Sequence, residues 1–215
     1  TENDTIPLNP QKTLRHALED EEFSTDKRLA HPEMAFAGGL LYDWLLGLAV
    51  QNKTIPRSAI PYLEEIWKQS LKTAQLAYHI GTALKTFKYQ NYAFASGLAL
   101  QIGRYLMASV FTASPSWTDF LTAARKARLD EFHPGFLIQE RKAFALTHSE
   151  FSAFVVSFFA PLRPMEKAIG FYQEPYILRL VHPDLFRLSV ILSVAHRLSS
   201  IPPEKRRVAR TVSDL

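Results

Sequence analysis

Apolar residues recur at helical spacing along most of the chain, and no segment alternates apolar and polar residues as a half-buried strand does. In residues 61–87, small and apolar side chains return every three or four positions, as on one face of an amphipathic helix: Ile66, Ser70, Thr73, Ala74, Ala77, Ile80 and Leu84. The pattern predicts an all-α protein, a compact helical bundle of about seven or eight helices.

Prolines and helix-capping residues mark where the predicted helices begin and end. Pro61 suits a first helical turn, Asn91 and Ser114 are candidate N-caps, and Thr147 with Glu150 forms a capping-box pattern. We expect a turn at 133–136, one helix within the polar arm at 10–22, and further helices over these segments: 34–50, 61–87, 91–113, 114–130, 137–146, 147–160, 165–173 and 183–200.

Two similar apolar segments contain glycines at positions where a helix is predicted. "AFASGLALQIGRYL" begins at residue 93, and "AFAGGLLYDWLLGL" begins at residue 35. A glycine inside a helix costs about 1 kcal/mol relative to alanine, so Gly97 and Gly103 predict a close approach of neighbouring helices. We interpret the earlier segment as a second core helix with Asp43 at its polar edge. A metal site at Asp43, with His16 upstream, is the alternative reading.

Composition narrows the class of protein. The chain of 215 residues is 47% hydrophobic and 21% charged, which is ordinary for a globular protein. It contains no cysteine, which excludes a disulfide framework and thiolate chemistry and fits a reducing cytoplasm. Apolar runs such as "FSAFVVSFFAPL" are too short to cross a bilayer. We therefore expect a cytoplasmic protein without a membrane span.

The predicted organisation has three parts: an N-terminal arm with leading helices over 1–59, a helical domain over 60–200, and a basic tail over 201–215. The formal net charge is +4, and part of the excess lies in the tail. No nucleic-acid-binding motif accompanies these charges, so a nucleic-acid partner is not expected.

Five phrases, in order, resemble an HDOD domain, the signalling branch of the HD phosphohydrolase superfamily. That family's phrases read approximately W-R-H-S, A-F-x-A-G-L-L-H-D-I-G-R, E-x-x-x-F-G-x-x-H-x-E-x-G-A, A-I-x-x-H-H-x-P and A-D-R-L. Their counterparts here lie between residues 60 and 200: "IWKQS", "AFASGLALQIGRYL", "ERKAFALTHSEFSAF", "AIGFYQEP" and "LSVAHRL". The resemblance implies a helical HD-type fold and a regulatory role in bacterial signal transduction.

The chain departs from the family where an HD enzyme binds its metal ions. By resemblance, His148 alone keeps its family residue, and the other vestigial positions are occupied as follows: Gln69 for the first His, Leu100 and Gln101 for the His-Asp pair, Tyr172 and Gln173 for the His-His pair, and His196 for the last Asp. Leucine offers no lone pair, and a glutamine amide carries no negative charge to hold Mg²⁺ or Mn²⁺. We therefore predict no metal, no cofactor and no catalytic residue.

Three readings of the degenerate site stay open. It could bind a ligand, it could be a filled part of the core, or it could still hydrolyse a phosphate ester with an unusual set of metal ligands. The pocket could bind a nucleotide or cyclic dinucleotide through Gln69, Gln101, Arg104, His148 and Tyr172. Alternatively, Leu100 and its neighbours fill the cavity, and His148 and His196 hydrogen-bond each other and water inside it. Motifs for nucleotide binding or hydrolysis such as G-x-x-x-x-G-K-[ST], H-E-x-x-H and G-x-S-x-G do not occur.

The aromatic residues around 151–176 predict a surface for a protein partner. Most should be core, but some could be exposed and form a binding patch: Phe158, Phe159, Phe171, Tyr172 and Tyr176. The main functional prediction is therefore a non-catalytic regulatory module that binds a partner protein, with a homodimer as one possibility.

Overall fold

The computed structural model describes residues 60–84, 92–111, 114–127, 129 and 131–201. These residues form helices and connections without a strand, which confirms the predicted all-α class for this part of the chain. The helices in chain order are α4 (Ile60–Ala83), α5 (Ala93–Ala99), α6 (Ile102–Phe111), α7 (Pro115–Lys126), α8 (Pro134–Phe144), α9 (His148–Ser157), η4 (Arg163–Met165), α10 (Glu166–Gly170), η5 (Pro175–Leu178) and α11 (Pro183–Ser199).

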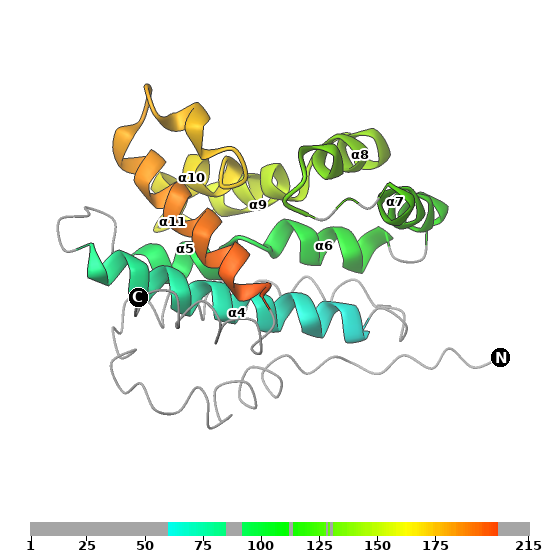
Figure 1. The fold of residues 1–215 in the computed structure, drawn as a ribbon, viewed down its shortest axis with the longest axis horizontal. Coiled ribbons are helices and arrows are strands. Elements are labelled where there is room, and N and C mark those ends of the chain that lie inside the picture. The colour runs from blue at the N-terminus through cyan, green and yellow to red at the C-terminus, as the bar shows by residue number, and fades with distance from the viewer. Residues whose placement is uncertain (1–59, 85–91, 112–113, 128, 130, 202–215) are drawn as a thin grey trace, which may run out of the picture.

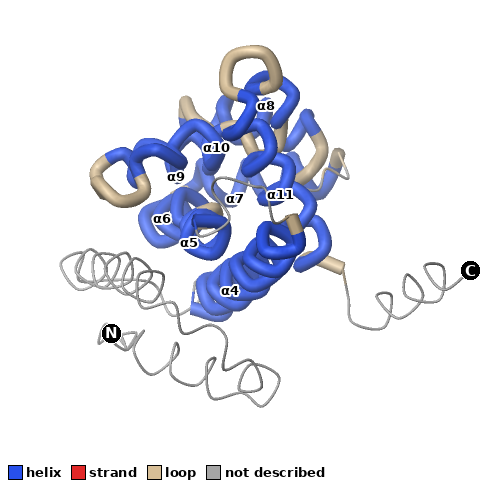
Figure 2. Tube along the Cα trace, turned by 90° about the vertical axis from the view of Figure 1, so that its left-hand side faces the viewer, coloured by secondary structure: helices blue, strands red, loops and turns tan. Residues whose placement is uncertain are grey.

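The long helix α4 lies along one side of the bundle, and α5, α6 and α11 pack against it (Figure 1). Helix α9 covers α6 and also contacts α10, so α8, α9 and α10 lie on the side of the bundle opposite α4 (Figure 2). The buried side chains between these layers form the main hydrophobic cluster, which draws residues from α4, α5, α6, α9, α10 and α11. Two of the positions named above, Leu100 and Tyr172, belong to this cluster.

The segment predicted as one helix from Asn91 to 113 is interrupted at Leu100 and Gln101, which form a turn between α5 and α6. The interruption is stabilised from α9 by the buried side chain of Ser152. Its hydroxyl oxygen accepts a hydrogen bond from the Gly103 N–H at 2.8 Å and lies 2.8 Å from the Leu100 carbonyl, to which it can donate. A tertiary contact therefore satisfies backbone groups that a continuous helix would pair internally.

Both glycines of this segment lie where neighbouring backbone leaves no room for a side chain. A Cβ atom on Gly97 would lie 2.7 Å from the Cα of Ala74 in α4. A Cβ on Gly103 would lie 2.0 Å from the carbonyl oxygen of His148 and 2.6 Å from the Ser152 nitrogen in α9. The predicted close helix approach is thus confirmed on both sides of the α5–α6 segment.

The capping predictions hold in most places. Thr147 and Glu150 form the complete capping box of α9, and Ser114 caps α7 by accepting a hydrogen bond from the Trp117 N–H. The expected turn at 133–136 is wrong, because His133 caps α8 with its side chain and Pro134 begins the helix. The predictions for 10–22, 34–50, Asp43 and Asn91 lie outside the described residues.

Replacing Gly103 by alanine should destabilise the protein by about 3 kcal/mol or more, because the new methyl group meets backbone atoms of α9 that cannot rotate away. Urea unfolding monitored by circular dichroism measures the effect. Gly170→Ala is the matched control, since its Cβ would meet only the Ala153 methyl at 3.1 Å. Equal stability losses in the two variants would contradict a special role for the α6–α9 contact.

Candidate functional site: a buried polar centre around Glu131

The positions that the sequence resemblance singled out come from widely separated elements, and most of them meet in one buried polar centre. Gln69 lies on α4, Gln101 in the turn between α5 and α6, and His196 on α11. The Nε2 atoms of Gln101 and His196 are 2.8 Å apart, and both side chains are fully buried. The expectation that these positions share one region, which rests on the resemblance, agrees with this geometry.

Glu131 connects these residues, although the sequence interpretation did not include it. Gln69 donates from Nε2 to Glu131 Oε1 at 3.1 Å, and His196 Nε2 lies 3.3 Å from the same oxygen. The other oxygen, Oε2, accepts a hydrogen bond from Arg104 Nη1. Gln173 joins through the Glu131 backbone, because its Nε2 donates to the carbonyl oxygen at 2.6 Å. The carboxylate thus binds side chains from α4, α6 and α11.

The charges of Glu131 and Arg104 compensate each other. Burial alone would raise the pKa of Glu131, but the Arg104 guanidinium, followed by a hydrogen bond with His196, holds this pKa well below its usual range. Burial alone would likewise lower the pKa of Arg104, yet the Glu131 charge and the Tyr62 hydroxyl raise it on balance. The pair is therefore ionised in the folded protein, with side chains 11% and 18% exposed.

His196 is held neutral near pH 7. Burial is the largest influence and lowers its pKa, although Glu131 acts in the opposite direction. With a proton on Nε2, the ring can donate to Glu131 Oε1 at 3.3 Å and accept at Nδ1 from Gln101 Nε2 at 3.3 Å. The Gln101 amide oxygen has no hydrogen-bond partner within the described part of the chain.

His148 belongs to a second chain of hydrogen bonds beside this centre. The Glu140 carboxylate accepts from the His148 backbone N–H at 2.9 Å and lies 2.8 Å from Nδ1. The opposite ring nitrogen lies 2.9 Å from the Tyr172 hydroxyl, which donates to it when Nδ1 carries the proton. The rings of Tyr172 and His196 lie 5.4 Å apart, so Tyr172 stands between the two hydrogen-bond networks. The expected hydrogen bond between His148 and His196 is therefore wrong, because each ring bonds to other partners in the described structure.

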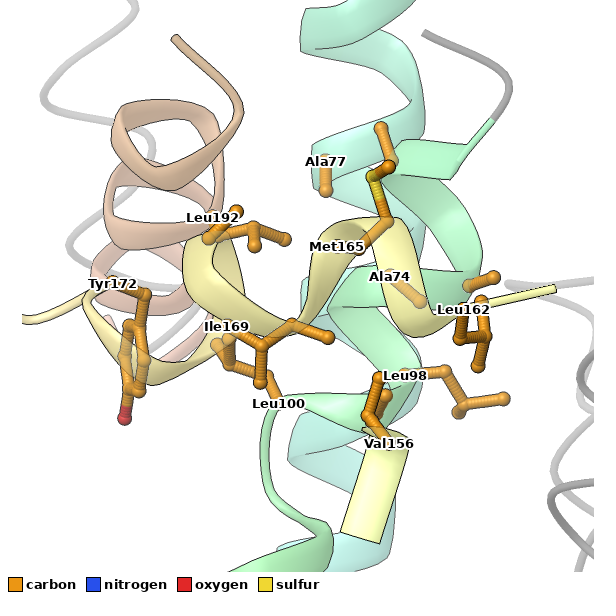
Figure 3. Packing of buried hydrophobic residues seen from close by; sticks show 14 of the residues in the cluster. Ala74, Ala77, Leu98, Leu100, Val156, Leu162, Met165, Ile169, Tyr172 and Leu192 are labelled. Atoms are coloured by element: carbon orange, nitrogen blue, oxygen red, sulfur yellow. The ribbon is translucent and has the colours of Figure 1, made fainter. Parts of the chain in front are cut away.

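A carboxylate, an imidazole and a hydroxyl in sequence form an arrangement that some enzymes use for nucleophilic catalysis. Here the terminal hydroxyl is inaccessible, because Tyr172 and His148 are both fully buried. Burial, its largest influence, raises the pKa of Tyr172 well above the ordinary value. Figure 3 shows the Tyr172 hydroxyl pointing away from the other labelled side chains of the hydrophobic cluster. The arrangement therefore fits a structural hydrogen-bond chain.

Leu100 does not join the polar centre. Its side chain is fully buried in the main hydrophobic cluster with Ile169 and Leu192 (Figure 3). The sequence reading in which Leu100 fills space agrees with this placement. In the described residues, no group of three or more His, Asp and Glu side chains is placed to hold a metal ion.

The aromatic residues proposed for a surface divide into exposed and buried members. Phe158 is 64% exposed and Tyr176 is 67% exposed, whereas Phe159 is half-buried and Phe171 lies at the surface. Tyr172 is wrong as a surface candidate, because its ring fills the space between His148 and His196.

The sequence interpretation missed Glu131 and Glu140. Glu140 lies in the quoted phrase "ERKAFALTHSEFSAF", eight residues before His148, and only the connection between α8 and α9 brings the two together. Ala145 ends α8 with a left-handed φ of 65°, which reverses the chain there. Glu131 had no comparable signal, since its partners are distant in sequence.

Comparison with protein-family models, curated proteins and solved structures finds no match for this chain. No helix among the residues that the structure describes is both long and apolar enough to cross a membrane.

Replacing Tyr172 by phenylalanine should lower the free energy of unfolding by about 1–2 kcal/mol, because a buried ring nitrogen of His148 loses its partner. Chemical denaturation measures the loss. Tyr176→Phe is the control, because the Tyr176 hydroxyl is exposed and its hydrogen bond to Glu174 Oε1 is long, at 3.4 Å. If Tyr176→Phe costs as much as Tyr172→Phe, the buried hydrogen-bond chain does not carry the stability assigned to it.

The stability of the fold should decrease on acidification in two stages. The folded-state pKa of His196 is lowered from 6.5, so the unfolded chain takes up this proton first and stability falls below about pH 6.5. The pKa of Glu131 is lowered from 4.5, so its contribution is present above that value and is lost as the pH falls further. Urea midpoints between pH 8 and about pH 3 test this sequence.

His196→Asn is the informative variant for the upper stage, because an asparagine does not titrate in this range. In this variant the folding stability should change less between about pH 7 and 5.5, and the loss of stability at lower pH should remain. An unchanged slope in the variant would assign the upper stage to other groups.

Proposed function

We propose that this chain is a non-catalytic regulatory module of the HDOD type, which acts by binding a partner protein in a signalling pathway. The observation that carries the proposal is the closed state of the polar centre. Gln101, His148, Tyr172 and His196 are each fully buried, and Glu131 with Arg104 occupies the side nearest to solvent. In the part of the chain that the structure describes, these four side chains present no exposed surface to a substrate phosphate.

The chemistry of the centre also argues against a divalent metal. HD-type hydrolysis, as the resemblance implies it, needs anionic ligands around two metal ions. Here the Glu131 carboxylate is neutralised by the Arg104 guanidinium, and a cation would have to displace that charge. The donors proposed for a nucleotide are engaged as well, because Arg104 binds Glu131 and also donates to the Tyr62 hydroxyl at 2.9 Å.

The partner surface proposed here is the α9 patch, which we define as Ile138, Phe154, Phe158 and Phe171. Their side chains are 56%, 57%, 64% and 37% exposed. Phe154 and Phe158 form an edge-to-face pair with ring centroids 4.9 Å apart. Three of the four residues line an open groove of about 710 Å³ over α8, α9 and α10. Exposed aromatic side chains beside a groove are typical anchors for an apolar segment of another protein.

The non-catalytic part of the proposal predicts that purified protein turns over no phosphodiester and holds no stoichiometric metal after incubation with Mn²⁺ or Mg²⁺. Metal analysis and an assay with a chromogenic phosphodiester measure both properties. Stoichiometric metal together with turnover that His148→Ala abolishes would overturn this part, because His148 alone retains its family residue.

The binding part predicts that a photo-crosslinking amino acid at Phe158 captures a discrete partner. The matched control carries the same amino acid at Lys68, an exposed position on α4 at the opposite side of the bundle (Figure 2). Crosslinks at position 158 that Phe154→Ser removes support the α9 patch, and a crosslink between two copies identifies the partner as a second chain. Crosslinks of equal yield at both positions, or at neither, contradict it.

A further inference from the structure

Several hydrogen-bond donors converge on the Glu131 carboxylate from separate helices. Arg104 of α6 binds Oε2, and Gln69 of α4 binds Oε1 at 3.1 Å. The hydroxyl of Ser200, directly after α11, lies 3.4 Å from Oε1, and His196 Nε2 lies at 3.3 Å. Glu131 itself belongs to the connection between α7 and α8. One charged group from a connecting segment thus occupies a cluster of donors built by three helices.

Each donor also has a second partner that holds it in place. Arg104 donates from Nε to the Tyr62 hydroxyl at 2.9 Å, and its guanidinium lies 5.6 Å from the centre of the Tyr62 ring. Gln69 donates to the Ser200 hydroxyl at 2.6 Å, and this hydroxyl is 3.1 Å from the His196 carbonyl. Arg104 and Gln69 therefore each keep a partner other than Glu131, as donors of a preorganised anion site do. The single Ser200 proton is shared between the His196 carbonyl and Glu131 Oε1.

We propose that Gln69, Arg104 and Ser200, with His196 beneath them, form a binding site for a small oxyanion. The Glu131 carboxylate is its internal occupant, and a free carboxylate or phosphate group takes the same place when Glu131 is absent or withdrawn. The site is within reach of solvent, because the Glu131 side chain retains 11% exposure and Ser200 is exposed. This inference goes beyond the proposed function and does not depend on it.

Chemical rescue of Glu131→Ala in the full chain tests the site. Thermal unfolding is measured at neutral pH in sodium chloride, sodium acetate and sodium phosphate at equal ionic strength. In chloride, the variant should unfold at a lower temperature than the unmodified protein, because the Arg104 charge has lost its partner. Acetate or phosphate should raise its Tm by about 3–5 °C above the value in chloride.

The unmodified protein should show a smaller acetate or phosphate effect, since Glu131 already occupies the donors. Both anions also stabilise folded proteins in general, so the difference between variant and unmodified protein is the quantity of interest. A larger rescue by acetate identifies the site as a carboxylate site, and a larger rescue by phosphate identifies it as a phosphate site. Equal shifts in the two proteins overturn the proposal.

The double variant Arg104→Met, Glu131→Ala separates this site from anion binding elsewhere. It removes the guanidinium together with the carboxylate. Acetate and phosphate should therefore raise its Tm no more than they raise the Tm of the unmodified protein. Rescue that persists without Arg104 overturns the proposal. If Glu131→Ala fails to fold in chloride, refolding yield replaces Tm: recovery in acetate or phosphate supports the site, and no recovery in either overturns it.

Discussion

The need to keep the Glu131 charge compensated in a nearly buried place determines how the polar side of this bundle is built. A carboxylate removed from water is tolerated only with an opposite charge and further donors close by. Arg104 supplies the charge, and Gln69 supplies a hydrogen bond. The same contacts join α4, α6 and α11 to the connection between α7 and α8. Removing one member of such a pair typically costs about 3–5 kcal/mol, so this single interaction has a large influence on the stability of the fold.

This charge arrangement is also unlike the metal site of the enzymes whose sequence phrases this chain resembles. A divalent cation is held by an excess of negative ligands, whereas here Arg104 balances the Glu131 carboxylate. The other groups of the centre are mainly amides and hydroxyls that hydrogen-bond within it, although the amide oxygens of Gln101 and Gln173 have no partner among the described residues. A centre of this kind stabilises one arrangement of helices, and in the proposed function recognition falls to the α9 patch.

Sequence reasoning predicted the features that depend on local or periodic information. The helical class, the capping box at Thr147 and the close approach at Gly97 and Gly103 all follow from residue type and spacing. The region shared by Gln101 and His196 followed from the resemblance. Glu131 could not be predicted, because its contact with Gln69 spans 62 positions and no local pattern distinguishes it from a solvated acid. The pairing of Glu140 with His148 likewise required the reversal at Ala145.

The interruption between α5 and α6 has a consequence for the order in which the chain folds. Residues 93–111 are apolar and helix-compatible on both sides of the turn, so an isolated segment would favour a continuous helix. The break becomes favourable once Ser152 of α9 reaches the Leu100 carbonyl and the Gly103 N–H. Until α9 has docked, the local sequence therefore favours a continuous helix over the native turn at this point. We expect the turn at Leu100 and Gln101 to form late in folding, after the helices on either side of it.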